Sequence, residues 1–494
     1  MSAIQGWEQF GRDEWVAREE ARRREAETAG KLSYRLRRAW ERVDGRLKLL
    51  AMLAVAGALP LFVHNPYLMR VAGLTGLYVI LAMGLNVVAG FAGLLDLGYV
   101  AFYGVGAYVY ALLASPQFDR HWPFWLVLPL VILVTALLGR LLGSPSLRLR
   151  GDYLAIVTLG FGQIACLLFI NLDRLHVPFL ERPLNITGGP NGILNVDDIR
   201  ILGYTVNTVV EYYYLILAFI AAVFLLVFHL DRSRIGRAWR AIREDELAAQ
   251  TMGIDVRQLK LLAFTVGAAI AGMAGAVFAA WQGAVFPPNF DVTILIILYS
   301  MMVLGGVGNI WGAITGAVVL SVLPELLRSP EAARLIFYSA LILTVMGLSR
   351  RERTRGLALL GGVGALGILL KVALTTWHPE WFLQPEMKAS VSGSILAPLT
   401  RMLNWWMLFP RAARPVGNIA FVLALSLLLG AYRLKGTARR VMLVPALYTL
   451  AFVWETRLVE EPSVTRMLIF GALLVLVMNY RPQGLFGSRW VQKV

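Results

Sequence analysis

The sequence predicts an all-α polytopic membrane protein with about fourteen transmembrane helices and with both termini on the cytoplasmic side. Of its 494 residues, 58% are hydrophobic and only 16% are charged, and the mean hydropathy is +0.64, which is too apolar for a soluble globular protein. Apolar runs of about 20 residues, the length that crosses the hydrocarbon core of a bilayer, recur along most of the chain. These runs are continuous rather than alternating, so they predict helices and not the strands of a barrel.

A charged arm precedes the spans. Residues 1–46 are rich in both Arg and Glu, unlike a signal or transit peptide, and they are expected to form a cytoplasmic N-terminal arm. The spans are then expected at 47–64, 67–90, 93–114, 122–141, 152–171, 211–230, 259–282, 290–306, 311–327, 334–349, 356–375, 416–432, 440–454 and 465–480.

Basic residues gather on one side of these spans. They are concentrated in the N-terminal arm and in the segments 140–150, 232–260, 350–355, 433–440 and 481–493. The loops on the opposite side mix acidic and basic residues more evenly, so the positive-inside rule makes the basic side cytoplasmic. The net charge of +16 is thus expected to orient the chain and to meet anionic lipid, and no nucleic-acid binding is expected.

Several glycine-rich blocks occur in a fixed order. The first is TGLYVILAMGLNVVAGFAGLLDLGYVAFYGVGAYVYALL at 75–113, and it is followed by LRLRGDYLAIVTLGFGQI at 147–164 and NITGGPNGI at 185–193. ILYSMMVLGGVGNIWGAITGAVVL at 297–320 and RPQGLFG at 481–487 complete the series. Together these blocks resemble the LivM-type permease family of branched-chain amino acid ABC importers, over roughly residues 66–348 and the C-terminal end.

The resemblance implies a permease subunit that moves branched-chain or other apolar amino acids across the bacterial inner membrane. Its implied partners are a LivH-type permease, two ATPase subunits and a periplasmic substrate-binding protein. A permease for urea or short amides and an ion-driven secondary transporter are the alternatives, although paired ionisable residues deep in the spans are scarce. Which cargo is carried, and whether its path lies within one subunit or between two, are left open.

A charged segment at 236–255, GRAWRAIREDELAAQTMGID, lies between two spans on the predicted cytoplasmic side. Acidic residues precede a short expected helix at 247–252, and the following glycine can end that helix in the left-handed conformation. The resemblance identifies the segment with the coupling helix that contacts an ATPase, and a solvated amphipathic loop is the alternative. The residues assigned to this contact are Arg237, Arg240, Glu244, Asp245, Ala248, Ala249 and Gly253, with both alanines expected on the surface.

Two polar residues and several glycines interrupt the first block. An ionisable group at membrane depth usually faces the bundle interior or a cavity, and dense glycines permit close packing, bends or interrupted helices. For Asp96 the alternative is capping of a helix end, and for the glycines it is packing alone. The candidate path residues are Asn86, Gly90, Gly93 and Asp96.

The longest polar interruption of the core, at 172–210, is expected on the periplasmic side. Its TGGPNG run predicts turns. A structured loop there could dock the binding protein, and a turn-rich connector is the alternative. The candidate docking residues are Thr187, Gly188, Gly189, Pro190, Asn191 and Gly192.

Nucleotide and metal motifs are missing from the sequence. No G-x-x-x-x-G-K-[ST] run occurs, so ATP hydrolysis is expected on other subunits and the chain is not expected to be an enzyme. The five histidines are widely spaced and Cys166 is the single cysteine, so no metal site and no cofactor are expected.

The C-terminal third departs from the family pattern. RLIFYSALILTVM at 334–346 is echoed by RMLIFGALLVLVM at 466–478, which carries the RPQGLFG tail. We therefore expect a permease core at 47–349, an inserted or duplicated membrane region at 350–464, and a last helix with a cytoplasmic tail at 465–494. The role of the inserted region is left open.

Overall fold

Helices make up most of the chain that the computed structural model describes. The described residues are 45–146, 152–173, 185–201, 203–326, 330–348, 353–377, 379–381, 406–408, 410–434, 436–460, 471, 475 and 484–486. The helices of the first part are α3 (Gly45–Phe62), α4 (Pro66–Leu85), α5 (Tyr99–Leu113), α6 (Phe124–Ser146), α7 (Asp152–Asn171), α8 (Val209–Arg232), α9 (Arg234–Glu244), α10 (Glu246–Thr251), α11 (Val256–Gln282), α12 (Val292–Gly305) and α13 (Ile310–Leu326). The C-terminal helices are α14 (Pro330–Leu348), α15 (Arg353–Trp377), α17 (Ala413–Arg433) and α18 (Gly436–Glu460).

The predicted membrane class is confirmed. Among the described residues, eight helical stretches are long and apolar enough to cross a membrane, and parts of α3, α5, α13, α14 and α18 form shorter apolar helices. Every expected span overlaps a described helix except the one at 465–480, which lies outside the described residues apart from 471 and 475. The arm at 1–46 also lies outside them except for its last two residues. The number of about fourteen crossings and the side of each terminus remain predictions.

The segment between α4 and α5 is more irregular than the sequence indicated. Asn65 caps α4 by accepting the Tyr67 N–H at 2.9 Å, and the helix then passes into a π-helical turn, η1 (Asn86–Phe91). The expected start of the next span at 93 is wrong, because α5 begins at Tyr99. Gly93 has φ +70°, which turns the backbone away from a helical course before α5 starts.

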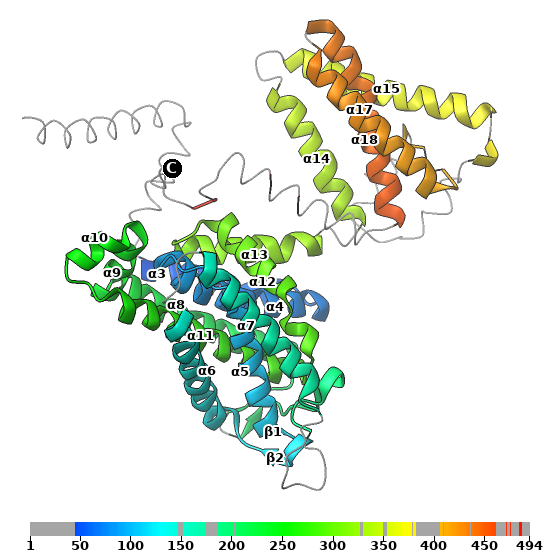
Figure 1. Cartoon of the computed structure of the whole chain (residues 1–494). Helices are drawn as coiled ribbons and strands as arrows, with labels where there is room; N and C mark the ends of the chain where they lie inside the picture. Colours follow the sequence, from blue (N-terminus) through cyan, green and yellow to red (C-terminus); the bar gives the residue numbers. More distant parts are fainter. Residues whose placement is uncertain are drawn as a thin grey trace, which may run out of the picture.

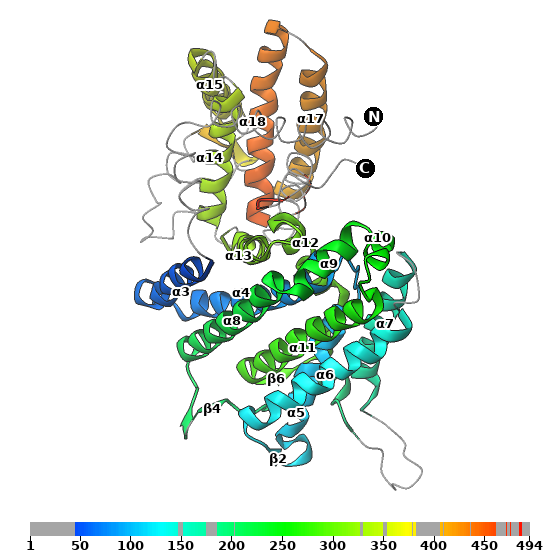
Figure 2. The ribbon, with the colours of Figure 1, turned by 90° about the vertical axis from the view of Figure 1, so that its left-hand side faces the viewer.

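The core lies where α4, α5, α6 and α11 pack together, and Figures 1 and 2 show α8 and α12 beside this group. Glycines permit the closest approaches: a Cβ on Gly106 of α5 would meet the backbone of Gly272 on α11. Gly316 of α13 faces the backbone of Met301 and Gly305 on α12 in the same way. These contacts show close helix packing at Gly106 and Gly316.

Short strands and 3-10 turns lie at the end of the bundle opposite α9 and α10 (Figures 1 and 2). Three antiparallel pairs form there, in which β1 pairs with β2, β3 with β6, and β4 with β5. The elements are β1 (Ala114–Ser115), η2 (Pro116–Phe118), β2 (Arg120–His121), η3 (Gly189–Asn191), β3 (Ile193–Leu194), β4 (Arg200–Ile201), β5 (Tyr204–Thr205), β6 (Ala284–Val285) and η4 (Pro287–Phe290). The two ends of the bundle are called the coupling end, at α9 and α10, and the strand end.

The C-terminal helices pack on one another, and both views show them set apart from the core (Figures 1 and 2). Tyr338 of α14 shares a hydrophobic cluster with Val363 of α15 and Tyr448 of α18. Arg334 forms an ion pair with Glu455 at 2.8 Å, and this carboxylate is almost fully buried. The helix α14 thus contacts the region at 350–464, where the 3-10 turn η5 (Pro379–Trp381) also lies.

Candidate coupling site

The helix α9 is capped at its start and fixed to the bundle near its middle. Ser233 caps it, since its hydroxyl accepts the N–H groups of Ile235 at 3.1 Å and Gly236 at 3.3 Å. Trp239, near its middle, is fully buried and donates its indole N–H to the carbonyl of Leu259 on α11 at 2.8 Å. A movement of α9 would therefore displace α11 directly, through the contact of Trp239 with Leu259.

The helix α10 is a compact capped unit, as the sequence predicted. The Asp245 carboxylate accepts the N–H groups of Leu247 at 2.9 Å and Ala248 at 3.0 Å. Gly253 follows the helix with φ +80°, which confirms the expected left-handed termination. The helix starts at Glu246, so Glu244 is not in its first turn but is the last residue of α9.

The two alanines of α10 differ in their surroundings. Ala248 is exposed, whereas Ala249 is 3% exposed and packs in a small cluster with Ile242 of α9 and Val256 of α11. The expectation that both alanines lie on the surface is wrong for Ala249. Its small side chain instead lets α10 pack closely against α9 and α11.

Two large apolar side chains project from this otherwise polar segment. Leu247 is 74% exposed and Met252 is 82% exposed. Exposed apolar groups on a rigid, capped helix are typical of a surface that a partner covers. Neither residue is among the contact residues predicted from the sequence, although two large apolar residues inside a charged segment are a visible signal.

The arginines assigned to the contact also brace the helix pair. Arg240 donates to the carbonyl of Asp231 at 2.9 Å and lies 3.6 Å from its carboxylate. Arg237 donates to the carbonyl of Arg232 at 3.1 Å. Because both acceptors lie at the end of α8, these two side chains join α8 to α9 and leave less of their charge for a partner.

One further arginine, Arg243 of α9, is exposed but contacts the η1 turn. Its guanidinium donates to the carbonyl of Gly90 in η1 at 2.5 Å. Side chains at Gly93 or Gly308 would collide with it, so both glycines leave room for this arginine. Asn86 accepts the N–H of Gly308 at 2.9 Å. The sequence singled out Asn86, Gly90 and Gly93. It did not single out Arg243, which connects them to the coupling helices.

Three of the four candidate path residues, Asn86, Gly90 and Gly93, therefore lie around Arg243 and Gly308, whereas Asp96 contacts α12. Asn86 and Asp96 are almost fully buried, and one polar atom of each, Asn86 Nδ2 and Asp96 Oδ2, has no hydrogen-bond partner in the structure. Asp96 accepts the N–H of Gly98, the N-cap of α5, at 2.9 Å, so it belongs to a turn before the helix and is not itself the N-cap. This turn packs against two spans, because the Leu97 N–H donates to the Thr158 hydroxyl of α7 at 3.0 Å and the Tyr299 hydroxyl of α12 donates to the Asp96 carbonyl at 2.8 Å. A role of these residues in transport stays a prediction.

At the strand end, the TGGPNG run forms a tight turn. Gly188, Gly189 and Gly192 have positive φ values, and a Cβ on Gly192 would meet the carbonyl of Val285. The next residues pair with β6, which follows α11. Of the six docking candidates, only Pro190 and Asn191 are exposed, while Thr187 is buried. These glycines thus shape the turn, and docking by its exposed tip stays a prediction.

In the part of the chain that the structure describes, no group of three or more His, Cys, Asp or Glu side chains could hold a metal ion.

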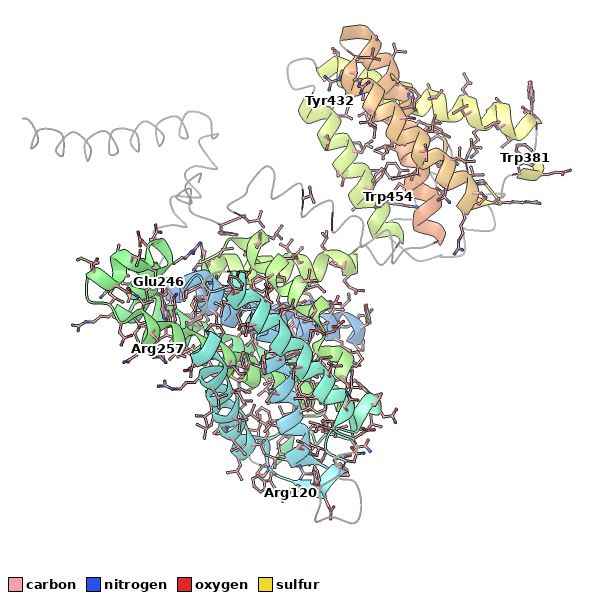
Figure 3. All side chains as sticks on the ribbon, viewed as in Figure 1. Arg120, Glu246, Arg257, Trp381, Tyr432 and Trp454 are labelled. Carbon is pink, nitrogen blue, oxygen red and sulfur yellow. The ribbon has the colours of Figure 1, made fainter. Side chains whose placement is uncertain are left out.

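Figure 3 shows Glu246 and Arg257 at the coupling end and Arg120 at the strand end. The charged coupling helices are thus far from the polar loops on the other side of the bundle.

A bundle of apolar helices with a rigid charged helix pair at one end defines a multi-pass membrane permease. The chain belongs to the family described as branched-chain amino acid transport system / permease component, whose model matches residues 67–346. The chain is accordingly a permease subunit of an ABC importer.

Several curated relatives are similar to the chain. The high-affinity branched-chain amino acid transport system permease protein LivM of Salmonella typhimurium is 39% identical over 330 residues, covering 62% of this chain and 73% of the relative. BraD of Pseudomonas aeruginosa is 30% identical over 261 residues, covering 50% of this chain and 80% of the relative. LivH of Escherichia coli is 25% identical over 286 residues, covering 54% of this chain and 88% of the relative. No solved structure matches the chain.

Proposed function

We propose that this permease carries branched-chain or other apolar amino acids into the cytoplasm across the bacterial inner membrane. The family match and the names of the relatives support this cargo. The proposed assembly contains a LivH-type permease, two ATPase subunits and a periplasmic binding protein. The observation that carries the proposal is the pair of exposed apolar side chains on a helix fixed to the core, namely Leu247 in α10 and Met252 at its C-cap.

In this proposal, α10 inserts Leu247 and Met252 into a groove of an ATPase subunit. Closure of the ATPases on ATP would move α10, and the ion pair of Glu246 with Lys260 at 2.6 Å would carry this movement to α11. Arg243 would carry it to η1 through the Gly90 carbonyl. Transport then follows as the helices alternate between two arrangements with access from opposite sides.

The proposed orientation puts the coupling end in the cytoplasm. Basic residues concentrate there, as the positive-inside rule requires. The strand end then faces the periplasm, where Pro190 and Asn191 at the tip of the TGGPNG turn are proposed to meet the binding protein. The exposed apolar helix faces meet lipid or the second permease.

The test replaces both apolar tips, as Leu247→Ser with Met252→Ser, in the assembled transporter in proteoliposomes. Loss of two buried interface side chains should reduce ATP-driven leucine uptake by roughly tenfold or more, because each such contact contributes about 1–2 kcal/mol. The matched control is Gln250→Ser, an exposed polar position on the same helix, which should keep uptake unchanged.

Two outcomes would contradict the proposal. Wild-type uptake in the double variant would show that α10 does not drive transport. Leucine uptake by this chain alone, powered by an ion gradient, would place it among secondary transporters instead. Competition by urea or short amides in the same assay tests the alternative cargo.

A further inference from the structure

A cavity of about 870 Å³ opens among the strand-end halves of α4, α11, α12 and α13. Its wall is mostly apolar and comes from all four helices, including Val71, Leu74, Phe278, Ile297, Met301 and Leu320. This size and character are typical of a pocket for a small molecule. The cavity lies apart from the coupling site, at the opposite end of the same helices.

Two side chains of opposite charge line this cavity, and neighbouring groups hold both in place. Arg70 donates to the side-chain carbonyl of Gln282 at 2.9 Å, and its guanidinium lies 5.6 Å from the centre of the Trp281 ring. Tyr67 donates its hydroxyl to the carboxylate of Glu325 at 2.5 Å. The cation and the anion are thus presented by fixed side chains of the same pocket.

The spacing of the two charges follows from α4. Tyr67 and Arg70 are three residues apart on this helix, so they lie on one face about 5–6 Å apart. Since Glu325 is bound to Tyr67, its carboxylate lies on the same side of the cavity as this face of α4. A molecule that carries an anion and a cation on neighbouring atoms could meet both.

A third polar group, the Ser321 hydroxyl of α13, lines the same cavity. Its buried oxygen has no hydrogen-bond partner in the structure. A buried hydroxyl without a partner is costly, and a bound polar group would satisfy it. Ser321 lies one helical turn before Glu325, on the same face of α13.

We propose that this cavity binds one free amino acid with an apolar side chain, with its carboxylate on Arg70 and its ammonium on Glu325 and Ser321. The apolar side chain then contacts Leu74, Ile297 and Met301. The class of substrate rests on the proposed function, whereas the location rests on the cavity and its charges. A lipid tail fits less well. It would displace water from the Arg70 guanidinium and the Glu325 carboxylate without forming hydrogen bonds to either group.

This site makes the permease itself selective. A carboxylate alone would meet only Arg70 and an ammonium alone would meet only Glu325 and Ser321, so each such analogue would lose one charge-assisted hydrogen bond that the zwitterion makes. The permease would thus accept the zwitterion that the binding protein delivers and reject analogues that lack either charge.

The experiment measures binding of tritiated leucine to the full-length chain in lipid nanodiscs, without ATPases or binding protein. Saturable binding is expected, and Arg70→Gln and Glu325→Gln should each weaken it by roughly tenfold or more, since each removes a charged hydrogen bond. The matched control is Arg120→Gln, an exposed arginine at the same strand end outside the cavity. Size-exclusion profiles check that each variant is folded.

Analogues identify which charge each side chain reads. Leucinol lacks the carboxylate, and 4-methylpentanoate lacks the ammonium, so both should displace leucine from the wild type at least roughly tenfold less well. In Arg70→Gln the preference for leucine over leucinol should disappear, and in Glu325→Gln the preference over 4-methylpentanoate should disappear.

Absence of saturable binding to the wild type, or equal binding by Arg70→Gln, would overturn the inference. Saturable leucine binding in detergent that is lost in lipid nanodiscs would also overturn it, since the cavity would then be a lipid site. Neither result affects the proposed function, which is tested by ATP-driven uptake through the assembled transporter and by the two tips of α10.

Discussion

At the scale of single residues, the caps of α10 and the contact of Arg243 with Gly90 connect the coupling end to the core. The caps of α10 lie within a few residues of each other, so Asp245 and Gly253 were visible in the sequence. The partner of Gly90 is Arg243, which follows 153 positions later. No local pattern shows that contact, and the same holds for Tyr67 and Glu325 in the cavity.

Arg243→Gln should separate ATP hydrolysis from transport. The shorter neutral side chain loses the charged hydrogen bond to the Gly90 carbonyl, which is worth about 1.5–3 kcal/mol, so movement of α9 reaches η1 less effectively. Leucine uptake in proteoliposomes should fall roughly tenfold while the ATPase rate of the assembled transporter is kept. Arg257→Gln removes the same charge from an exposed position at the coupling end and serves as the control. If both variants transport equally well, Arg243 transmits nothing.

At the scale of elements, hydropathy located the helices well because each apolar run had to be continuous to cross the bilayer. Boundaries failed where the backbone changes course, as at the turn after η1, where a left-handed glycine delays the start of α5 until Tyr99. The burial of Ala249 was also missed, because it depends on how α10 packs against Ile242 and Val256. Glycine density correctly indicated close helix contacts, but only the structure shows which helices meet.

Gly106→Ala should destabilise the contact between α5 and α11. An added Cβ would meet the backbone of Gly272, which can move only with the whole helix, so overpacking should cost about 1–3 kcal/mol. The midpoint of thermal unfolding in detergent, followed by fluorescence, should fall by a few degrees. Gly160→Ala is the control, since nothing lies within 4 Å of its added Cβ and alanine favours the helix by up to about 1 kcal/mol. A similar fall in both variants would mean that the contact is not tight.

At the scale of the whole molecule, the sequence indicates an inserted region in the C-terminal third, and the structure shows which parts of that third contact the core. The internal echo indicated an inserted or duplicated region, and the structure shows α14 paired with α18 of that region through Arg334 and Glu455. The residues at 484–486, beyond this region, return to the core. The N–H groups of Leu485 and Phe486 donate to the carbonyls of Leu304 at 2.8 Å and Gly305 at 2.9 Å, at the end of α12.

The short tail should therefore matter more to transport than the long inserted region. Truncation after residue 483 removes both backbone bonds to α12 and the bond from Asn309 to the Phe486 carbonyl, each worth about 1 kcal/mol. Because these bonds hold the loop beside Gly308 and Arg243, leucine uptake should fall severalfold. Deletion of 350–464 also removes Glu455, the ion-pair partner of Arg334, so it is combined with Arg334→Leu. This variant should keep uptake near the wild-type rate. Loss of uptake in the deletion, with normal uptake in the truncation, would show instead that the inserted region belongs to the transport machinery.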